Sequence, residues 1–163
     1  MRECTEVELS KYLDVFIEEA KENLQSLNDG LLRLGEGQAG VIDEVFRSAH
    51  TLKGMAATMG FGEVAELTHA MENIFDLLRR GDKRYTESLA DVLFACLDAM
   101  ESFINEVGPD YVPTIKEHAD LIRRLNNSSS SAPTIAERST PVSPIVSLPP
   151  LMEINEYEQN ILQ

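Results

Sequence analysis

One histidine in this sequence stands where its imidazole can react with another molecule. Apolar residues around it recur every three or four positions between residues 41 and 59, which is the spacing of one helix face. At about 100° per residue, His50 lies roughly 120° from the centre of that apolar face, on the solvent-accessible flank of the helix. Lys53 follows one turn later, close enough for its ammonium group to share a ligand with His50. The pair suits an exposed nucleophile beside a positive charge.

Gly54 lies four residues beyond His50, on the same side of this predicted helix. A glycine inside a helix costs about 1 kcal/mol relative to alanine, so the missing side chain needs a reason. Close approach of another macromolecule to the histidine is one reason. Close packing of a neighbouring helix is the other, and the spacing does not choose between them.

A second pair of candidate residues lies on the next predicted helix. His69 and Glu72 are three residues apart and away from the apolar face, so both can face one neighbouring helix. A carboxylate that accepts a hydrogen bond from one imidazole N–H fixes the tautomer and makes the other nitrogen a better nucleophile. Glu72 is the candidate for that role toward His50. Spacing alone leaves open that His69 and Glu72 are only a surface pair.

The elements that must position these residues are predicted from four apolar stripes with helical spacing. The stripes cover residues 9–34, 41–59, 64–78 and 89–107, and glycine-containing breaks separate them. Thr5 and Glu8 have the spacing of a capping box, so the first helix should begin near them. Gly60 and Gly81 are expected to end the second and third helices. Short connections force neighbouring helices to run in opposite directions, so the predicted fold is all-α, an antiparallel up-and-down four-helix bundle.

The end of the sequence predicts a short fifth helix and then a tail. A second capping box, Thr114 to Glu117, should start a helix that ends near Leu125 and packs against the end of the bundle. We therefore expect three segments: the bundle at residues 1–125, a Ser- and Pro-rich flexible linker at 126–150, and the truncated start of a following folded unit at 151–163. Cut off there, the last segment should be disordered or loosely helical.

Composition limits the classes of partner. The chain of 163 residues carries 28 acidic and 14 basic residues, a formal charge of −14, which argues against binding nucleic acid and favours protein partners. A small basic patch, Arg79, Arg80, Lys83 and Arg84, marks the end of the third helix as a solvated helix end or else a docking surface.

The cysteines and the hydropathy of the chain suggest its compartment. Cys4 and Cys96 are far apart without a C-x-x-C pattern and are interpreted as free thiols, which suits the cytoplasm. No apolar run approaches the roughly 20 residues of a membrane span, and the first residues lack the apolar stretch of a secretion signal. A soluble cytoplasmic protein is expected, with the isolated bundle monomeric and no membrane partner.

The stretch Ala49 to Gly54, continued to Phe61, closely resembles the phosphorylation-site helix of the histidine phosphotransfer domain in chemotaxis histidine kinases. The resemblance covers about residues 8–125. It implies that His50 takes the γ-phosphoryl group of ATP from a separate kinase domain of the same protein, in trans within a dimer, and passes it to an aspartate of a response regulator. It also implies that residues 151–163 begin a domain that binds response regulators.

The same resemblance assigns roles to the residues around His50. Lys53, His69 and Glu72 occupy positions that match the lysine, second histidine and glutamate around the phosphorylated histidine of the family. Lys53 would stabilise the phosphoryl oxygens electrostatically, and His69 would complete the hydrogen-bond network. The fragment would then be a carrier and not itself an enzyme, with no cofactor or metal of its own, although its parent would be a histidine kinase.

Three other interpretations of the sequence are open. A di-iron bundle needs two Glu-x-x-His motifs; Glu66 to His69 supplies one, but Arg47 stands where His50 would need a glutamate. The bundle could also belong to a phosphorelay outside chemotaxis, or serve only as a structural docking bundle. His118, without a lysine or glycine at comparable spacing, is interpreted as a surface residue.

Overall fold

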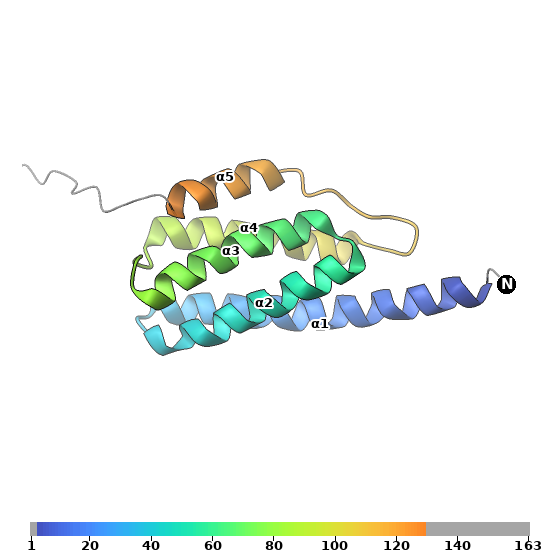
Figure 1. Cartoon of the computed structure of the whole chain (residues 1–163), viewed down its shortest axis with the longest axis horizontal. Helices are drawn as coiled ribbons and strands as arrows, with labels where there is room; N and C mark the ends of the chain where they lie inside the picture. Colours follow the sequence, from blue (N-terminus) through green and yellow to red (C-terminus); the bar gives the residue numbers. More distant parts are fainter. Residues whose placement is uncertain (1–2, 130–163) are drawn as a thin grey trace, which may run out of the picture. The chain divides into compact units, whose positions relative to one another are not determined.

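The computed structural model describes residues 3–129, and the side chains of residues 10–129. Figure 1 shows the helices, which in chain order are α1 (Glu3–Gly35), the short 3-10 turn η1 (Ala39–Val41), α2 (Ile42–Met59), α3 (Gly62–Arg80), α4 (Glu87–Glu106) and α5 (His118–Ser129). No β-strand forms within residues 3–129, so the all-α prediction is confirmed. None of the helices in this range has the length and apolarity that crossing a membrane requires. The predicted linker beyond Ser129 and the predicted unit at 151–163 lie outside the described residues.

Helices α1 to α4 form the predicted antiparallel bundle. Helix α2 packs against both α1 and α3, and α4 packs against α1 and α3 (Figure 1). Each helix turns its apolar stripe inward; the largest fully buried side chains are Phe75, Leu27, Leu31, Leu52, Leu67, Met71, Ile74, Leu93, Met100, Ile104, Leu121 and Leu125. Burying one such side chain contributes about 1.5–3 kcal/mol, so the stripes fix how each helix is rotated about its own axis. The flank that carries His50 therefore has to face outward.

The ends of the central helices follow the predicted signals. Gly60 and Gly81 both have φ near 77°, a left-handed conformation that glycine adopts without steric cost, and they end α2 and α3. Thr86 caps α4, because its hydroxyl oxygen accepts a hydrogen bond from the Leu89 amide at 3.3 Å. Only Gly60 and Phe61 separate α2 from α3, which makes those two helices antiparallel neighbours.

Both predicted capping boxes are wrong. Helix α1 already begins at Glu3, so Thr5 lies inside it, and the side chains of that turn are outside the described range. Helix α5 begins at His118 and not at Thr114. The reason is a competing tertiary contact: the Ile115 amide donates to the Glu63 carboxylate at the start of α3, at 2.7 Å, which ties the preceding segment to another helix.

The fifth helix also differs from the prediction in its place and its length. Helix α5 lies along α3 and α4 (Figure 1), whereas the sequence predicts that it packs against the end of the bundle. It continues to Ser129, past the boundary expected at Leu125. Leu121 and Leu125 are buried and supply its contact with the core. The fifth helix therefore extends the core along one side of the bundle.

Gly30, near the C-terminal end of α1, is a close-packing position that was not predicted from the sequence. A methyl group at this position would overlap Cγ2 of Val45 on α2. The absence of a side chain lets the backbone of α1 approach α2 closely. The close packing offsets the low helix propensity of glycine. This contact sets the spacing between the two helices that border the site.

Candidate functional site

His50 lies on the exposed flank of α2, as predicted. The neighbouring stripe residues Ala49 and Leu52 are wholly buried, whereas the His50 side chain is 63% exposed. His50 is nine residues before the end of α2, and Glu72 is ten residues after the start of α3. At 1.5 Å per residue both lie roughly 14–15 Å from the tight turn that joins the helices, and hence at the same level of the bundle.

Glu72 makes the contact that the sequence predicted for it. Its Oε1 lies 2.8 Å from Nδ1 of His50, while its Oε2 forms an ion pair with the Lys53 ammonium. Glu72 itself is only 8% exposed. One buried carboxylate therefore holds both the imidazole and the lysine, and the three side chains form one connected cluster between α2 and α3.

The electrostatics keep this carboxylate ionised. Burial by itself raises the pKa of Glu72, but the hydrogen bonds and charges of Lys53 and His50 outweigh it, so the pKa lies below the ordinary value of 4.5. An ionised carboxylate can only accept hydrogen bonds, so the proton in the short contact belongs to Nδ1 of the imidazole. In the neutral ring this leaves the lone pair on Nε2. The cluster thus presents one nucleophilic nitrogen on the side of the ring away from Glu72.

His69 does not join this cluster. It is exposed on α3, and within the described residues it makes no hydrogen bond or ion pair with His50 or Glu72. The hydrogen-bond network around His50 therefore includes Glu72 and Lys53 but not the predicted member His69. Any role of His69 in the reaction stays a prediction.

Gly54 faces open space. A methyl group at this position would meet no atom within 4 Å beyond its own helix, so close packing of a neighbouring helix does not explain this glycine. Close approach of another molecule stays the prediction for this position. Of the two helix-interior glycines, Gly30 on α1 serves packing inside the bundle and Gly54 on α2 does not.

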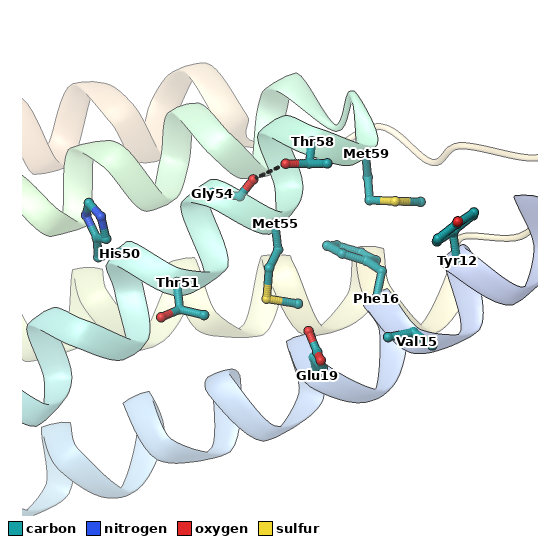
Figure 2. A pocket seen from close by; sticks show the side chains of 10 residues that line it. All are labelled: Tyr12, Val15, Phe16, Glu19, His50, Thr51, Gly54, Met55, Thr58 and Met59. Carbon is teal, nitrogen blue, oxygen red and sulfur yellow. Dashed lines mark hydrogen bonds between the residues drawn. The ribbon is translucent and has the colours of Figure 1, made fainter.

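An apolar groove of about 730 Å³ runs beside His50 and Gly54, between α1 and α2. Figure 2 shows His50 at one end of the groove and Tyr12 and Val15 of α1 toward the other, with Met55 between them. Tyr12 and Val15 are large apolar side chains that are 67% and 53% exposed. The reactive nitrogen is therefore bordered by apolar surface that a partner protein can cover.

Two residues near His50 were not identified from the sequence as part of the site. Phe46, one turn earlier on α2, has its ring plane within 13° of the imidazole plane, with 6.3 Å between the centroids. The Arg79 guanidinium of α3 lies over the same phenyl ring, 4.3 Å from its centroid. The i,i+4 spacing of Phe46 and His50 was a signal for the first contact, but the second depends on how α2 and α3 are placed against each other.

Several of the remaining charged candidates form ion pairs within the fold. Arg79 and Arg80 form ion pairs with Asp76, so part of the predicted basic patch is neutralised by acidic neighbours. His118, interpreted as a surface residue, has a side chain only 18% exposed, and its Nε2 lies 3.4 Å from Oε2 of Glu66. Within residues 3–129 no three His, Cys, Asp or Glu side chains are grouped so that they could hold a metal ion.

Comparisons with known proteins agree with this geometry. Residues 11–103 match the Hpt domain family. The chemotaxis protein CheA of Listeria monocytogenes is 50% identical over 128 residues, which cover 76% of this chain and 21% of that protein. The CheA phosphotransferase domain from Thermotoga maritima is 44% identical with a TM-score of 0.58, over 60% of this chain and 94% of that one.

A more distant structure has the same fold. The phosphorylated P1 domain of CheA3 in complex with CheY6 from R. sphaeroides is 19% identical, with a TM-score of 0.66 over 72% of this chain and 94% of that one. The chain spans about a fifth of the length of the CheA proteins that it matches. From its fold, its family match and its CheA relatives, the chain belongs to the Hpt domain family of phosphocarriers, of the type found in CheA chemotaxis proteins.

Proposed function

We propose that His50 is the phosphorylated residue, taking the γ-phosphoryl group of ATP from a kinase domain and passing it to an aspartate of a response regulator. The observation that carries this proposal is the 2.8 Å contact between Glu72 and Nδ1, made on an imidazole that is 63% exposed. It combines a fixed tautomer with an accessible nitrogen. A histidine with only a structural role has no need of either.

The first transfer begins with attack of the Nε2 lone pair on the γ-phosphorus. The bond from phosphorus to the bridging oxygen breaks, and ADP leaves with that electron pair. Positive charge develops on the imidazole, and the ionised Glu72 beside Nδ1 stabilises it. Lys53, held on the same carboxylate, lies one turn from His50, where its ammonium can offset the charge of the phosphoryl oxygens.

The second transfer reverses the roles. A carboxylate oxygen of the acceptor aspartate attacks the phosphorus, the bond between phosphorus and Nε2 breaks, and the electron pair returns to the imidazole. Glu72 keeps Nδ1 protonated throughout, so the histidine is ready for another cycle. His69 is exposed on α3 and lies outside the cluster, and its role in supporting the phosphorylated state rests on its matching position in the family.

The partners and the compartment belong to the same proposal. The ATP site lies on a separate domain, the kinase domain of the parent protein, which acts in trans within a dimer. The domain described here is a substrate and carrier, and it uses no cofactor of its own. Identity with CheA proteins supports such a parent, and the complex of a similar fold with CheY6 supports a response regulator as acceptor. The cytoplasm is the compartment in which ATP and these partners meet.

A labelling experiment tests the site. The 163-residue chain is incubated with radiolabelled ATP and a separately purified CheA kinase domain, and the label is followed on the chain. One phosphoryl group, labile in acid and stable in base, is expected; His50→Gln should abolish it and the control His118→Gln should keep it. Label retained in His50→Gln would refute the assignment, and absence of label from every variant would favour a structural docking bundle.

A further inference from the structure

We propose that Phe46, braced by Arg79, is a positioning residue that holds the plane of the His50 imidazole for phosphoryl transfer. The inference rests on the proposed role of His50. It assigns a task to two side chains, Phe46 and Arg79, that form no hydrogen bond or ion pair with Glu72. The Phe46 ring stacks on the His50 imidazole, and the Arg79 guanidinium lies over the Phe46 ring.

The need for such a residue follows from what Glu72 leaves free. The torsion between Cβ and the imidazole ring of a histidine has a broad energy minimum, so the ring plane is not fixed by the side chain itself. One hydrogen bond restrains Nδ1, but it tolerates rocking of the ring about the Cβ–Cγ bond. Because the His50 side chain is 63% exposed, few other atoms limit this motion. Rocking would swing Nε2 away from the line of attack on phosphorus.

The phenyl ring of Phe46 supplies the missing restraint. Its plane lies within 13° of the imidazole plane, and the 6.3 Å centroid distance is within the range of offset aromatic pairs. A phenyl ring in a plane parallel to that of the imidazole opposes tilting of the imidazole about the Cβ–Cγ bond, which is the motion that the Glu72 hydrogen bond permits. The two contacts therefore restrain different motions of one side chain.

Arg79 connects this restraint to α3. Its guanidinium centre lies 4.3 Å from the centroid of Phe46, and its Nη2 is fixed by Oδ1 of Asp76 at 2.7 Å. Glu72, Asp76 and Arg79 are spaced four and three residues apart, so they share one face of α3. Helix α3 thus acts on the imidazole twice, directly through Glu72 and indirectly through Arg79 and Phe46.

The alternative is that Phe46 is only a partly buried packing residue at the edge of the core. Phe46→Leu separates the two roles, because leucine keeps an apolar side chain at the position and removes the aromatic plane. Phe94→Leu is the matched control: Phe94 is another partly buried phenylalanine packed against the core, but it lies on α4. A packing role predicts similar effects of the two substitutions, whereas a positioning role does not.

The test combines kinetics with motion of the ring. Phosphorylation by a CheA kinase domain is measured under saturating and limiting concentrations of the chain, and 13C relaxation reports the mobility of the His50 ring. Phe46→Leu should lower kcat about three- to tenfold with KM unchanged and should make the ring more mobile, since small misplacements of a reacting group are costly. Phe46→Tyr should restore both, and Phe94→Leu should leave both at the parent values.

Arg79→Gln tests the brace. A smaller loss of kcat is expected, and it should disappear when Phe46 is already leucine, because Arg79 acts only through that ring. Parent values of kcat and ring mobility in Phe46→Leu would overturn the proposal, as would equal changes in Phe94→Leu. If the parent chain gains no phosphoryl group, the proposed function fails, while the relaxation measurements still decide whether Phe46 orders the imidazole.

Discussion

Replacing Gly54 by alanine should stabilise the bundle and impair its reactions with partner proteins. The added methyl group meets no atom within 4 Å beyond its own helix, so it introduces no steric cost in the free protein. The gain in helix propensity is then realised in full, about 0.5–1 kcal/mol in the free energy of unfolding. For a helical domain of this size that corresponds to a rise of roughly 2–5 °C in melting temperature.

The effect on phosphoryl transfer should have the opposite sign. If a partner approaches the helix backbone beside His50, the methyl group of Gly54→Ala intrudes into that contact, and overpacking of this kind costs about 1–3 kcal/mol. The second-order rate constants for transfer from the kinase domain and to the response regulator should fall about 5- to 150-fold. A small donor such as phosphoramidate needs no docked protein surface, so its reaction with His50 should be unchanged.

Thermal denaturation followed by circular dichroism measures the change in stability. Quench-flow experiments measure the rates of phosphoryl transfer from the kinase domain, from phosphoramidate and to the response regulator. Transfer to and from both proteins at the parent rates would refute close approach as the reason for Gly54. A lower melting temperature would contradict the open surroundings of this position. An equal loss with phosphoramidate would mean that the substitution disturbs His50 itself.

Four further substitutions or treatments have defined outcomes. Glu72→Gln should slow phosphorylation, measured by label incorporation, by about tenfold or more and should leave the helicity unchanged. The reason is that an uncharged amide neither fixes the His50 tautomer nor stabilises the imidazolium. A rate equal to that of the parent would remove Glu72 from the mechanism. The free energy of unfolding of the parent, measured by urea titration, should decrease as the pH falls below about 4.5, because the pKa of Glu72 is lower in the folded than in the unfolded chain. The decrease should be smaller in Glu72→Gln. Gly30→Ala should lower the free energy of unfolding by up to about 2 kcal/mol, since overlap with Val45 outweighs the helix-propensity gain; a stabilised variant would be evidence against that contact. Burial raises the pKa of the Cys96 thiol to about 12, so this thiol should be alkylated far more slowly in the native protein than in denaturant. Mass spectrometry of the peptide that contains Cys96 measures the two rates.

The parts of the structure that sequence could predict are those that depend on local spacing. The stripe that buries Ala49 and Leu52 also determines that His50 faces outward, and the glycines at 60 and 81 end their helices where the chain needs a positive φ. The pairing of Glu72 with His50 was predictable as well. A two-residue turn places positions equally distant from it opposite each other.

The parts that could not be predicted depend on contacts between helices. Thr114 has the capping-box spacing, yet Glu63 takes the Ile115 amide and the helix starts later. Whether a residue three positions before Glu72 joins the cluster or faces solvent depends on the rotation of α3 against α2, and His69 faces solvent. The overlap that a methyl group at Gly30 would cause likewise appears only when α1 and α2 are placed side by side.

The short contact between Glu72 and Nδ1 also determines the regiochemistry of the product. Histidine can be phosphorylated on either ring nitrogen, and the two positional isomers differ in shape, in hydrolytic stability and in the antibodies that recognise them. Because the carboxylate 2.8 Å away covers one nitrogen, phosphorylation of the folded domain should yield a single isomer, with phosphorus on Nε2. Antibodies raised against the Nδ1 isomer should fail to detect the phosphorylated domain. An antibody specific for the Nε2 isomer gives a direct way to follow the phosphorylated domain in whole cells.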